Sequence, residues 1–430
     1  MINIEKIYDL FLAARSISTD SRKIEPGNLF FALKGANFNG NQYAGNALEK
    51  GASYAIIDEK KYCINERTIL VDDVLTCLQE LALFHRKQLG IPILAITGTN
   101  GKTTTKELVA AVLSRKFNIT YTRGNLNNHI GVPLTLLSMN SKTQFGVVEM
   151  GANHPGEIAM LCRISAPDYG LITNIGRAHL EGFGSFEGVI KTKGELYDYI
   201  EQTNGTIFFN KDNAILEQLS RNITKRISYG LTRADINGEP VLSPPYVHVK
   251  VNFPKGMLYL NSKLTGDYNF ENILAATCIG NYFGVDPLVI QEAIKAYTPG
   301  NNRSQLIQKN KLKIIMDAYN ANPTSMKASI DSFSPNSGNN YLILGDMLEL
   351  GEYSNEEHLA ILDFIREKGF QNVFLVGKEF AESNKTFDYL SFPNVEELCV
   401  FLEKEKIKNG NILIKGSRGI RLEKVLDVLA

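Results

Sequence analysis

Two features that would direct the interpretation elsewhere are absent from this chain of 430 residues. Its 46 Lys and Arg balance its 46 Asp and Glu, so no excess of positive charge is present to cover nucleic acid or an anionic membrane. No uninterrupted apolar run approaches the roughly 18–20 residues that a membrane span requires. The sequence therefore predicts a protein that neither wraps nucleic acid nor spans a membrane.

Paired cysteines and a secretion signal are also missing. The cysteines are odd in number, lie far apart and include no C-x-x-C pair: Cys63, Cys77, Cys162, Cys278 and Cys399. This pattern is typical of reduced, mostly buried thiols in a cytosolic protein. Residues 1–14 carry Glu5, Lys6 and Asp9 among apolar residues, which predicts an amphipathic helix and argues against a signal peptide. We therefore expect a cytoplasmic protein.

The length of the chain and its loop segments predict three α/β domains. At about 150 residues per domain, the chain has room for about three. Gly, Pro and Asn gather in segments 85–92 and 297–303, as they do in loops between domains. The expected domains are residues 1–88, 89–297 and 298–430. The first is a small mixed α/β unit, the second a parallel-sheet domain of the P-loop ATPase type, and the third a Rossmann-like domain.

Strands that alternate with helices support the parallel sheets of this fold class. The predicted strands are residues 28–33, 54–58, 91–97, 144–150, 169–173, 312–317, 341–344, 373–376 and 412–414. The predicted helices are residues 42–50, 103–116 and 188–200, with four more that begin near Pro323, Ser354, Val395 and Arg421.

The clearest motif lies between predicted strand 91–97 and predicted helix 103–116. It reads Gly98, Thr99, Asn100, Gly101, Lys102, Thr103 and Thr104. Glycines let backbone N–H groups close around an anion, and the helix N-terminus adds partial positive charge. Lys102 would reach the β- and γ-phosphates of ATP, and the Thr103 hydroxyl would hold Mg²⁺. The alternative is a solvated turn with a chance lysine, which the flanking strand and helix argue against.

Two further residues could hold a second cation. Glu149 ends predicted strand 144–150, and His179 follows predicted strand 169–173, so both would open into the crevice of the phosphate loop. A lone histidine at the surface or in the core is the alternative for His179. Two cations would suit the attack of a carboxylate on the γ-phosphate of ATP, since they neutralise the repulsion between the two anions. An amine would then displace phosphate and form an amide.

These motifs resemble those of the Mur ligases, ATP-dependent amide-forming enzymes of peptidoglycan precursor synthesis, over nearly the whole chain. Ser18, Thr19, Asp20, Ser21 and Arg22, followed by residues 26–35, resemble the uridine-diphosphate domain of the two later ligases. Segments 125–133, 149–158, 317–323 and 345–351 resemble the branch that adds D-alanyl-D-alanine. The branch that adds the third residue would carry an Asp-Asn-Pro-Arg motif, and this chain has none.

The resemblance implies the substrates UDP-N-acetylmuramoyl-tripeptide and D-alanyl-D-alanine, ATP, two Mg²⁺ ions and a monomer. Thr103, Glu149 and His179 would bind Mg²⁺, together with Lys193 if that lysine is carbamylated, because carbamylation turns the cation into an anion. The neighbouring Lys191 is expected to matter less. For each lysine the alternative is an exposed, charged helix face.

The resemblance also implies further contacts. Lys102, Lys193, His179 and Arg303 would be catalytic, with Arg303 brought to the γ-phosphate by closure about segment 297–303. Besides the phosphate loop and Arg303, the residues implied to bind ATP are Asn269, Asn272, Asp317, Tyr319 and Asn320. Helix capping is the alternative for the two residues Asn269 and Asn272. Besides residues 18–22, those implied to bind substrate are Asn125, Asn127, Asn128, Asn322, Lys415, Ser417 and Arg418.

Three other functions stay open at this stage. Two are ligases of the same class: the sister enzyme that adds the third residue, and a folate polyglutamate ligase. The third is a catalytically silent scaffold that binds nucleotide. The missing Asp-Asn-Pro-Arg run disfavours the first, and the uridine-type segment 18–22 disfavours the second. Since a scaffold needs no metal ligands, the presence of Lys102, Thr103, Glu149 and His179 argues against the third.

Overall fold

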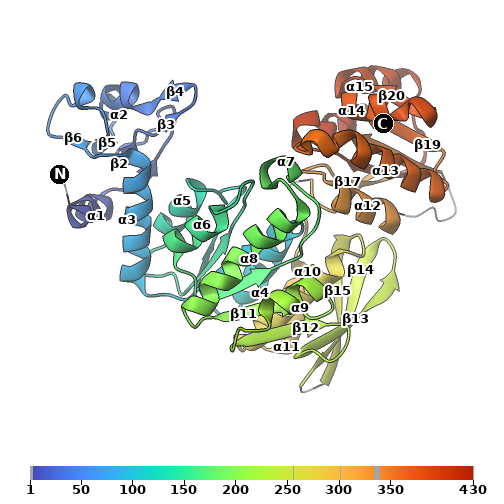
Figure 1. Ribbon diagram of the computed structural model, residues 1–430, viewed down its shortest axis with the longest axis horizontal. Coiled ribbons are helices and arrows are strands. Elements are labelled where there is room, and N and C mark those ends of the chain that lie inside the picture. The colour runs from blue at the N-terminus through green and yellow to red at the C-terminus, as the bar shows by residue number, and fades with distance from the viewer. Residues whose placement is uncertain (1–2, 255, 301, 334–338, 430) are drawn as a thin grey trace.

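The computed structural model describes residues 3–254, 256–300, 302–333 and 339–429, and it confirms a fold of three α/β domains (Figure 1). The sheets have four, nine and six strands in chain order, with a two-stranded ribbon in the first domain. Met1, in the predicted first helix, and Asn301, in the second predicted joint, lie outside the described residues. No helix within the described ranges has the length and hydropathy of a membrane span. The domain boundaries stay predictions.

The first domain is a parallel sheet in the order β1-β2-β5-β6, flanked by helices and joined to the ribbon β3-β4. Its elements are α1 (Ile4–Ala13), β1 (Ser16–Ser18), β2 (Asn28–Phe31), β3 (Lys34–Gly35), β4 (Phe38–Asn39), α2 (Ala44–Glu49), β5 (Tyr54–Ile57), β6 (Thr68–Leu70) and α3 (Val74–Leu89). The predicted helix 42–50 is shorter in the structure, because a 3-10 turn occupies Gly40–Tyr43.

Helix α3 joins the first domain to the second as a packed element. The predicted joint 85–92 is narrower than expected, since α3 continues to Leu89 and ends at Gly90, which adopts a φ of +62°. Arg86 in its last turn donates to the carbonyl of Ala166 at 3.0 Å and pairs with Asp168 at 2.7 Å. Both partners lie in the central domain, so these contacts hold the two domains together.

The central domain is a nine-stranded sheet in the order β15-β14-β13-β12-β11-β10-β7-β9-β8. Its strands are β7 (Ile93–Thr97), β8 (Ile119–Tyr121), β9 (Phe145–Glu149), β10 (Tyr169–Ile172), β11 (Thr206–Asn210), β12 (Arg226–Gly230), β13 (Ile236–Ser243), β14 (Tyr246–Phe253) and β15 (Gly256–Thr265). Its helices are α4 (Lys102–Leu113), α5 (Gly131–Leu137), α6 (Glu157–Ser165), α7 (Leu180–Phe183), α8 (Phe186–Gln202), α9 (Ala214–Ser220), α10 (Asn269–Tyr282) and α11 (Pro287–Ala296).

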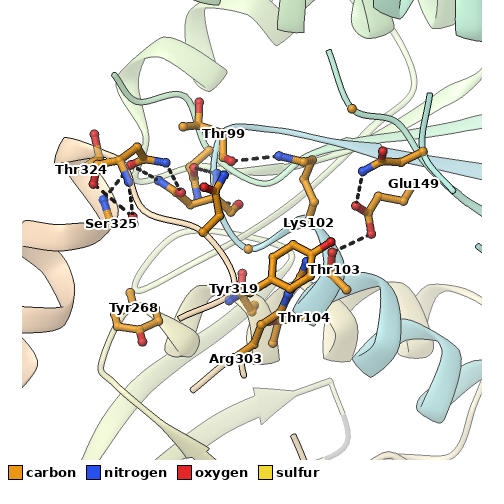
Figure 2. A pocket seen from close by; sticks show the side chains of 18 of the residues that line it. Thr99, Lys102, Thr103, Thr104, Glu149, Tyr268, Arg303, Tyr319, Thr324 and Ser325 are labelled. Atoms are coloured by element: carbon orange, nitrogen blue, oxygen red, sulfur yellow. Dashed lines mark hydrogen bonds between the residues drawn. The ribbon is translucent and has the colours of Figure 1, made fainter. Parts of the chain in front are cut away.

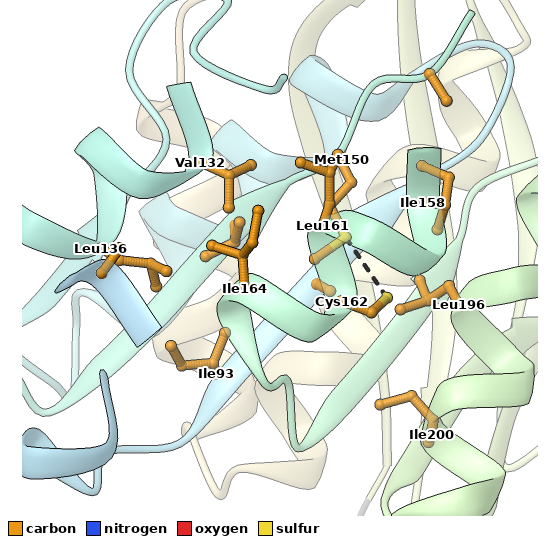
Figure 3. Packing of buried hydrophobic residues seen from close by; sticks show 14 of the residues in the cluster. Ile93, Val132, Leu136, Met150, Ile158, Leu161, Cys162, Ile164, Leu196 and Ile200 are labelled. Atoms are coloured by element: carbon orange, nitrogen blue, oxygen red, sulfur yellow. Dashed lines mark hydrogen bonds between the residues drawn. The ribbon is translucent and has the colours of Figure 1, made fainter. Parts of the chain in front are cut away.

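Strands β10, β7 and β9 are parallel neighbours, so their carboxyl ends meet at one edge of the sheet. Every residue of β7 is buried, as a strand covered on both faces requires. Side chains of α5, α6 and α8 pack on one face of this sheet, among them Leu136, Cys162 and Leu196 (Figure 3). The cysteines bear out the expectation of mostly buried thiols: Cys77, Cys162 and Cys278 are buried, Cys399 is half-buried and Cys63 is exposed.

The C-terminal sheet has the order β16-β17-β21-β18-β19-β20 and is parallel except for β16. Its elements are β16 (Gln305–Lys309), β17 (Leu312–Asp317), α12 (Pro323–Ser332), β18 (Asn340–Gly345), α13 (Ser354–Glu367), β19 (Asn372–Val376), α14 (Lys378–Ser383), β20 (Leu390–Phe392), α15 (Val395–Lys404), β21 (Gly410–Lys415) and α16 (Val425–Val428). The predicted helix start at Arg421 is wrong. This residue adopts a φ of +60° between two 3-10 turns, and α16 begins four residues later.

The C-terminal domain is docked on the central domain, and the first domain lies on the opposite side of the molecule (Figure 1). The Asn322 side-chain amide donates to Oδ1 of Asn100 at 2.7 Å, which connects α12 to the phosphate loop. Arg177 pairs with Glu357 at 2.9 Å, and its backbone N–H donates to Oγ1 of Thr324 at 3.1 Å. The interface between these two domains is where the candidate site lies.

Candidate active site

A cavity of about 810 Å³ lies where the carboxyl ends of β7 and β9 face the C-terminal domain. Most of the residues predicted for the site line it: Thr99, Asn100, Gly101, Lys102, Thr103, Thr104, Asn125, Asn127, Asn128, Glu149, His179, Asn269, Asn272, Arg303, Asp317, Tyr319, Asn320, Asn322 and Lys415. Figure 2 shows the phosphate loop, Glu149 and Arg303 converging on this space. Segments more than 200 residues apart in the chain therefore meet at one site.

The phosphate loop is shaped by two glycines in conformations that side chains rarely adopt. Gly98 has a φ of +141° and Gly101 a φ of +77°. The Lys102 ammonium donates to the carbonyl of Gly98 at 2.7 Å and to that of Thr99 at 2.9 Å, so it is folded onto its own loop. Burial lowers the pKa of Lys102 to about 8, and the nearby charge of Arg303 acts in the same direction. The charge of Glu149 opposes this shift, and a phosphate group would add further negative charge beside the lysine.

Glu149 is connected to the phosphate loop by direct hydrogen bonds. Its Oε2 accepts from the Thr103 hydroxyl at 2.9 Å, and its Oε1 accepts from the Asn127 amide at 2.8 Å (Figure 2). The residue is only 1% exposed. The argument from strand ends thus placed Glu149 beside Thr103, as the parallel pairing of β7 with β9 requires.

Lys106 is a residue of this site that the sequence reasoning missed. Its ammonium lies 3.6 Å from Oε2 of Glu149, is fully buried, and makes no hydrogen bond with any described residue. Burial lowers the pKa of Lys106, while the charge of Glu149 opposes that shift. The spacing could have found this lysine, since residues three apart on a helix share a face and Thr103 precedes it by three.

His179 lines the cavity from the loop that follows β10. It adopts a left-handed φ of +52°, and its Nδ1 contacts Oε2 of Glu349 in the C-terminal domain. The ring therefore lies at the interface of the two domains, and the metal-binding role of His179 stays a prediction. Sequence reasoning did not connect Glu349 with this histidine, since the two residues are 170 positions apart.

Lys193 and Lys191 differ as expected. Lys193, on α8, is 2% exposed, and its ammonium donates to the carbonyl of Ala152 at 3.4 Å, directly behind the cavity wall. Burial, aided by the charge of Lys102, lowers the pKa of Lys193 to about 7. Lys191 is exposed. The exposed-face alternative therefore holds for Lys191 and is wrong for Lys193.

Asn269 and Asn272 form a buried hydrogen-bonded chain beneath the phosphate loop. The Thr105 hydroxyl donates to Oδ1 of Asn272 at 2.9 Å, and the Asn272 amide donates to Oδ1 of Asn269 at 2.8 Å. Capping is not their role, because the cap residue of α10 is Tyr268 and no side chain caps that helix. The pair connects α10 to α4 at the floor of the cavity.

The C-terminal residues of the site are engaged with one another. The Arg303 guanidinium lies 3.6 Å from the centre of the Tyr319 ring, a cation–π arrangement. Oδ2 of Asp317 accepts from the buried Lys415 ammonium at 2.5 Å and from the Ser329 hydroxyl at 3.0 Å. Asp317 and Lys415 are partners across neighbouring strands, so this lysine already has its counter-ion.

Some predicted substrate residues lie away from the cavity. Ser417 is buried, and its hydroxyl accepts from the backbone N–H of Leu348 at 2.9 Å. Arg418 pairs with Glu423 at 3.0 Å and has a side chain that is 58% exposed. Arg22 forms a two-pronged pair with Asp20 in the first domain, and this pair lowers the pKa of Asp20 to about 2. The cavity wall includes none of these four among its described residues.

The donor chemistry of the cavity fits Mg²⁺. Within the described part of the chain, no group of three or more His, Cys, Asp and Glu side chains is arranged to hold a metal by itself. Glu149 and Thr103 offer hard oxygen donors 2.9 Å apart. Mg²⁺ commonly takes one or two protein oxygens and completes its shell with phosphate and water. A nucleotide in the phosphate loop would supply those missing oxygens.

Known proteins are similar to this chain in sequence and in fold. Three family descriptions match the chain: the Mur ligase family catalytic domain at residues 14–86, the Mur ligase middle domain at 96–280, and the Mur ligase glutamate ligase domain at 302–418. The UDP-N-acetylmuramoyl-tripeptide–D-alanyl-D-alanine ligase of Bacillus subtilis (strain 168) is 35% identical, covering 96% of this chain and 92% of that protein.

Solved structures agree with the sequence matches. MurF from Acinetobacter baumannii superposes with a TM-score of 0.89 at 29% identity, over 99% of this chain and 98% of that chain. MurF from Thermotoga maritima, solved in complex with ADP, gives a TM-score of 0.86 at 28% identity over 98% of each chain. With similarity in all three domains, and with a phosphate loop, a buried Glu149 and a docked third domain around one cavity, the chain belongs to the Mur ligase family.

Proposed function

We propose that the chain joins UDP-N-acetylmuramoyl-tripeptide to D-alanyl-D-alanine at the expense of ATP, in the synthesis of a peptidoglycan precursor. The terminal carboxylate of the tripeptide attacks the γ-phosphate, which gives ADP and an acyl phosphate. The amine of the dipeptide then attacks the acyl carbon, phosphate leaves, and UDP-N-acetylmuramoyl-pentapeptide forms. The observation that carries this proposal is the single cavity shared by Lys102, Glu149 and Arg303, residues of two domains. The similarity to D-alanyl-D-alanine ligases over nearly the full chain supports the choice of substrates.

The residues of the cavity suit phosphoryl transfer to a carboxylate. The phosphate loop binds the phosphates through backbone N–H groups, and Lys102 turns from its own carbonyls towards the β- and γ-phosphates. Arg303, held over Tyr319, adds positive charge on the side of the C-terminal domain. Two Mg²⁺ ions are proposed. They would be held by Thr103, Glu149 and His179 and would neutralise charge between the two reacting anions. Exclusion of water by the docked domain protects the acyl phosphate from hydrolysis.

Lys193 is proposed to carry a carbamate. Only a neutral amine reacts with CO₂, and burial lowers the pKa of Lys193 to about 7, so a large fraction is neutral at physiological pH. The amine nitrogen would attack the carbon of CO₂ and lose a proton, which yields a carbamate anion. Behind the wall formed by Ala152, that anion would add negative charge near the cation site.

The remaining contacts follow the arrangement of the domains. Asn269, Asn272, Asp317, Tyr319 and Asn320 are proposed to surround the nucleotide, and Asn125, Asn127 and Asn128 the reacting end of the tripeptide. The uridine diphosphate would lie at residues 18–22 of the first domain. Asn322 is the proposed dipeptide contact of the cavity, whereas Lys415, Ser417 and Arg418 would reach the dipeptide only by leaving their present partners.

The cellular setting is part of the same proposal. ATP and nucleotide-linked precursors are supplied in the cytoplasm, and an unpaired set of cysteines suits a reducing compartment. We place the enzyme there. We also propose that it acts as a monomer, because one chain provides all the residues of the cavity.

The first experiment is phosphate release from MgATP with UDP-N-acetylmuramoyl-tripeptide, in the presence and absence of D-alanyl-D-alanine, followed by mass spectrometry of the product. We expect release that depends on the dipeptide and a pentapeptide product. Lys102→Met should reduce kcat by about 10²–10³-fold, since it removes a charge aimed at the transferred phosphate. Lys191→Met, which changes an exposed lysine, is the matched control and should retain full activity.

Other outcomes would contradict the proposal. Release that requires a UDP-muramoyl dipeptide and a free diamino acid would identify the sister ligase that adds the third residue. Nucleotide binding without turnover under every combination of substrates would identify a silent scaffold.

A further inference from the structure

We propose that Glu349 is a positioning residue that orients His179 when the C-terminal domain docks. In this arrangement the Glu349 carboxylate contacts Nδ1 of the imidazole, which leaves Nε2 as the nitrogen for a cation in the cavity. The inference rests on the proposed function, because it assigns a task to a histidine of that active site. It also gives a task to segment 345–351, whose motif the reaction scheme above does not use.

The contact joins two loops from different domains. His179 follows β10 in the central domain, and Glu349 follows β18 in the C-terminal domain. Both residues adopt left-handed backbone conformations, with φ of +52° and +65°, which non-glycine residues rarely do. Such conformations cost energy and persist where surrounding contacts over-determine them, often at functional sites. The two residues with this uncommon backbone conformation are therefore in contact with each other.

The loop that carries Glu349 is anchored by the three residues before it. Asp346 accepts from the backbone N–H of Phe380 at 2.9 Å and from that of Glu379 at 3.1 Å. The Met347 N–H donates to Nε2 of the buried His358 at 3.0 Å, and the Leu348 N–H donates to the Ser417 hydroxyl at 2.9 Å. Three consecutive residues before Glu349 are therefore held by their own domain, so the backbone that carries Glu349 moves with that domain.

The same loop lies directly against the central domain. A Cβ added to Gly351 would come within 3.2 Å of the Glu181 side chain on α7, so the backbone at this point approaches the helix that follows His179. Nearby, Arg177 pairs with Glu357 at 2.9 Å. The carboxylate of Glu349 thus reaches His179 because the two domains are docked, and undocking would remove it.

Histidines that bind metals commonly give their other ring nitrogen to a carboxylate, which sets the tautomer and the direction of the ring. Here that carboxylate comes from the C-terminal domain, which is the domain proposed to move on closure. The cation site is then complete only after the third domain arrives, which couples closure to the binding of metal and nucleotide. A competing arrangement is one in which Glu349 blocks His179 and must leave before a cation binds. The two arrangements predict opposite effects of removing the carboxylate.

Titration of Mn²⁺ by electron paramagnetic resonance, with a non-hydrolysable ATP analogue bound to the full chain, measures the site without turnover. We expect Glu349→Ala to weaken Mn²⁺ binding by about ten-fold, the lower end of the range for such partners. Glu349→Gln, which keeps an acceptor oxygen, should recover part of that loss. Glu352→Ala, at an exposed position of the same loop, should bind Mn²⁺ as the wild type does.

Unchanged or tighter Mn²⁺ binding in Glu349→Ala would overturn the inference, and tighter binding would identify Glu349 as a blocking group. If Glu349→Ala fails to fold, Glu349→Gln is tested in its place. Wild-type affinity for Mn²⁺ in Glu349→Gln, which has no acidic charge at this position, would contradict an ionic role of the carboxylate. A wild-type protein that binds the nucleotide analogue but no Mn²⁺, and shows no dipeptide-dependent turnover, would instead count against the proposed function itself.

Discussion

Lys193 and Lys191 illustrate how burial separates two residues of the same type two positions apart on α8. The exposed lysine keeps water around its charge, whereas Lys193 loses that solvation, and its pKa falls to about 7. Helical spacing places Lys193 on the face of the buried Val189 and Leu196 and Lys191 on another face, but only the packed structure shows that a charged residue is buried there. The chemical consequence is a lysine that can be a neutral nucleophile at physiological pH.

This predicts a dependence on pH and bicarbonate. Above pH 7 the Lys193 amine is neutral and can form the carbamate, and below it the amine is protonated and cannot. We expect added bicarbonate to raise the activity of CO₂-depleted enzyme at pH 8 and to have little effect at pH 6. Carbon-13 NMR with labelled bicarbonate should show a carbamate signal in the wild type and in Lys191→Met, and none in Lys193→Met. Equal bicarbonate responses in both variants would rule out this role.

At the scale of elements, the unit β7–phosphate loop–α4 depends on close backbone approach. A Cβ added to Gly98 would come within 2.0 Å of the Thr173 hydroxyl on the neighbouring strand end, and the φ of +141° is itself unfavourable for a side chain. Gly90, at the end of α3, also has a positive φ of +62°, but a Cβ there would meet nothing within 4 Å. A comparison of substitutions at Gly98 and Gly90 therefore separates the cost of backbone strain from the cost of a steric clash.

Gly98→Ala is expected to lower the free energy of unfolding by more than about 2 kcal/mol, because strain and overpacking add. It should also abolish binding of a fluorescent ATP analogue. Gly90→Ala should cost only about 1 kcal/mol, from strain alone, and leave nucleotide binding intact. Denaturant unfolding and fluorescence titration measure the two effects. Equal losses of stability in both variants would show that the contact with Thr173 is relieved by movement.

At the scale of the whole molecule, the site exists because two domains are docked. The contacts between Asn100 and Asn322 and between Arg177 and Glu357 are polar, as is common in interfaces between domains that move. The predicted hinge, segment 297–303, joins these domains. The Arg177 side chain is 56% exposed while that of Glu357 is buried, so we take about 1 kcal/mol for the contribution of the pair to docking.

Even that contribution should shift the balance between open and docked forms about five-fold, since 1.4 kcal/mol corresponds to ten-fold. We expect Arg177→Ala to increase the radius of gyration of the free protein in small-angle scattering. An ATP analogue with the tripeptide substrate should restore compaction. Arg366→Ala, which breaks an ion pair within α13 alone, is the control. Identical scattering of all three free proteins would mean that other contacts hold the domains together.

Local motifs made much of this protein predictable from its sequence. The phosphate loop lies on a strand, a turn and a helix that are consecutive in the chain, and α12 begins at the Asn322–Ser325 capping box with Pro323 in its first turn. To predict the position of Glu149, one further rule was needed: the carboxyl ends of parallel strands lie at the same edge of the sheet. In each case the physical cause acts over a few residues or through a general property of sheets.

Contacts between distant segments were not predictable in this way. The antiparallel strands β13 to β15 extend the parallel sheet through pairing that no local pattern distinguishes from other hairpins. Arg418, which the resemblance implies as a substrate contact, pairs with Glu423 in this structure, because a charged side chain takes the nearest opposite charge that the fold provides. Which partner is nearest depends on the folded chain.

The sequence by itself determined the three-domain α/β class, the phosphate loop and the family, since these depend on local order and on motif spacing. Only the tertiary structure decided that Lys106 lies beside Glu149 without a hydrogen bond to any described residue, that Lys193 is buried, and that Glu349 contacts His179. The reason is physical: burial and charge pairing depend on distances in space, and chain connectivity does not set those distances for residues far apart in sequence.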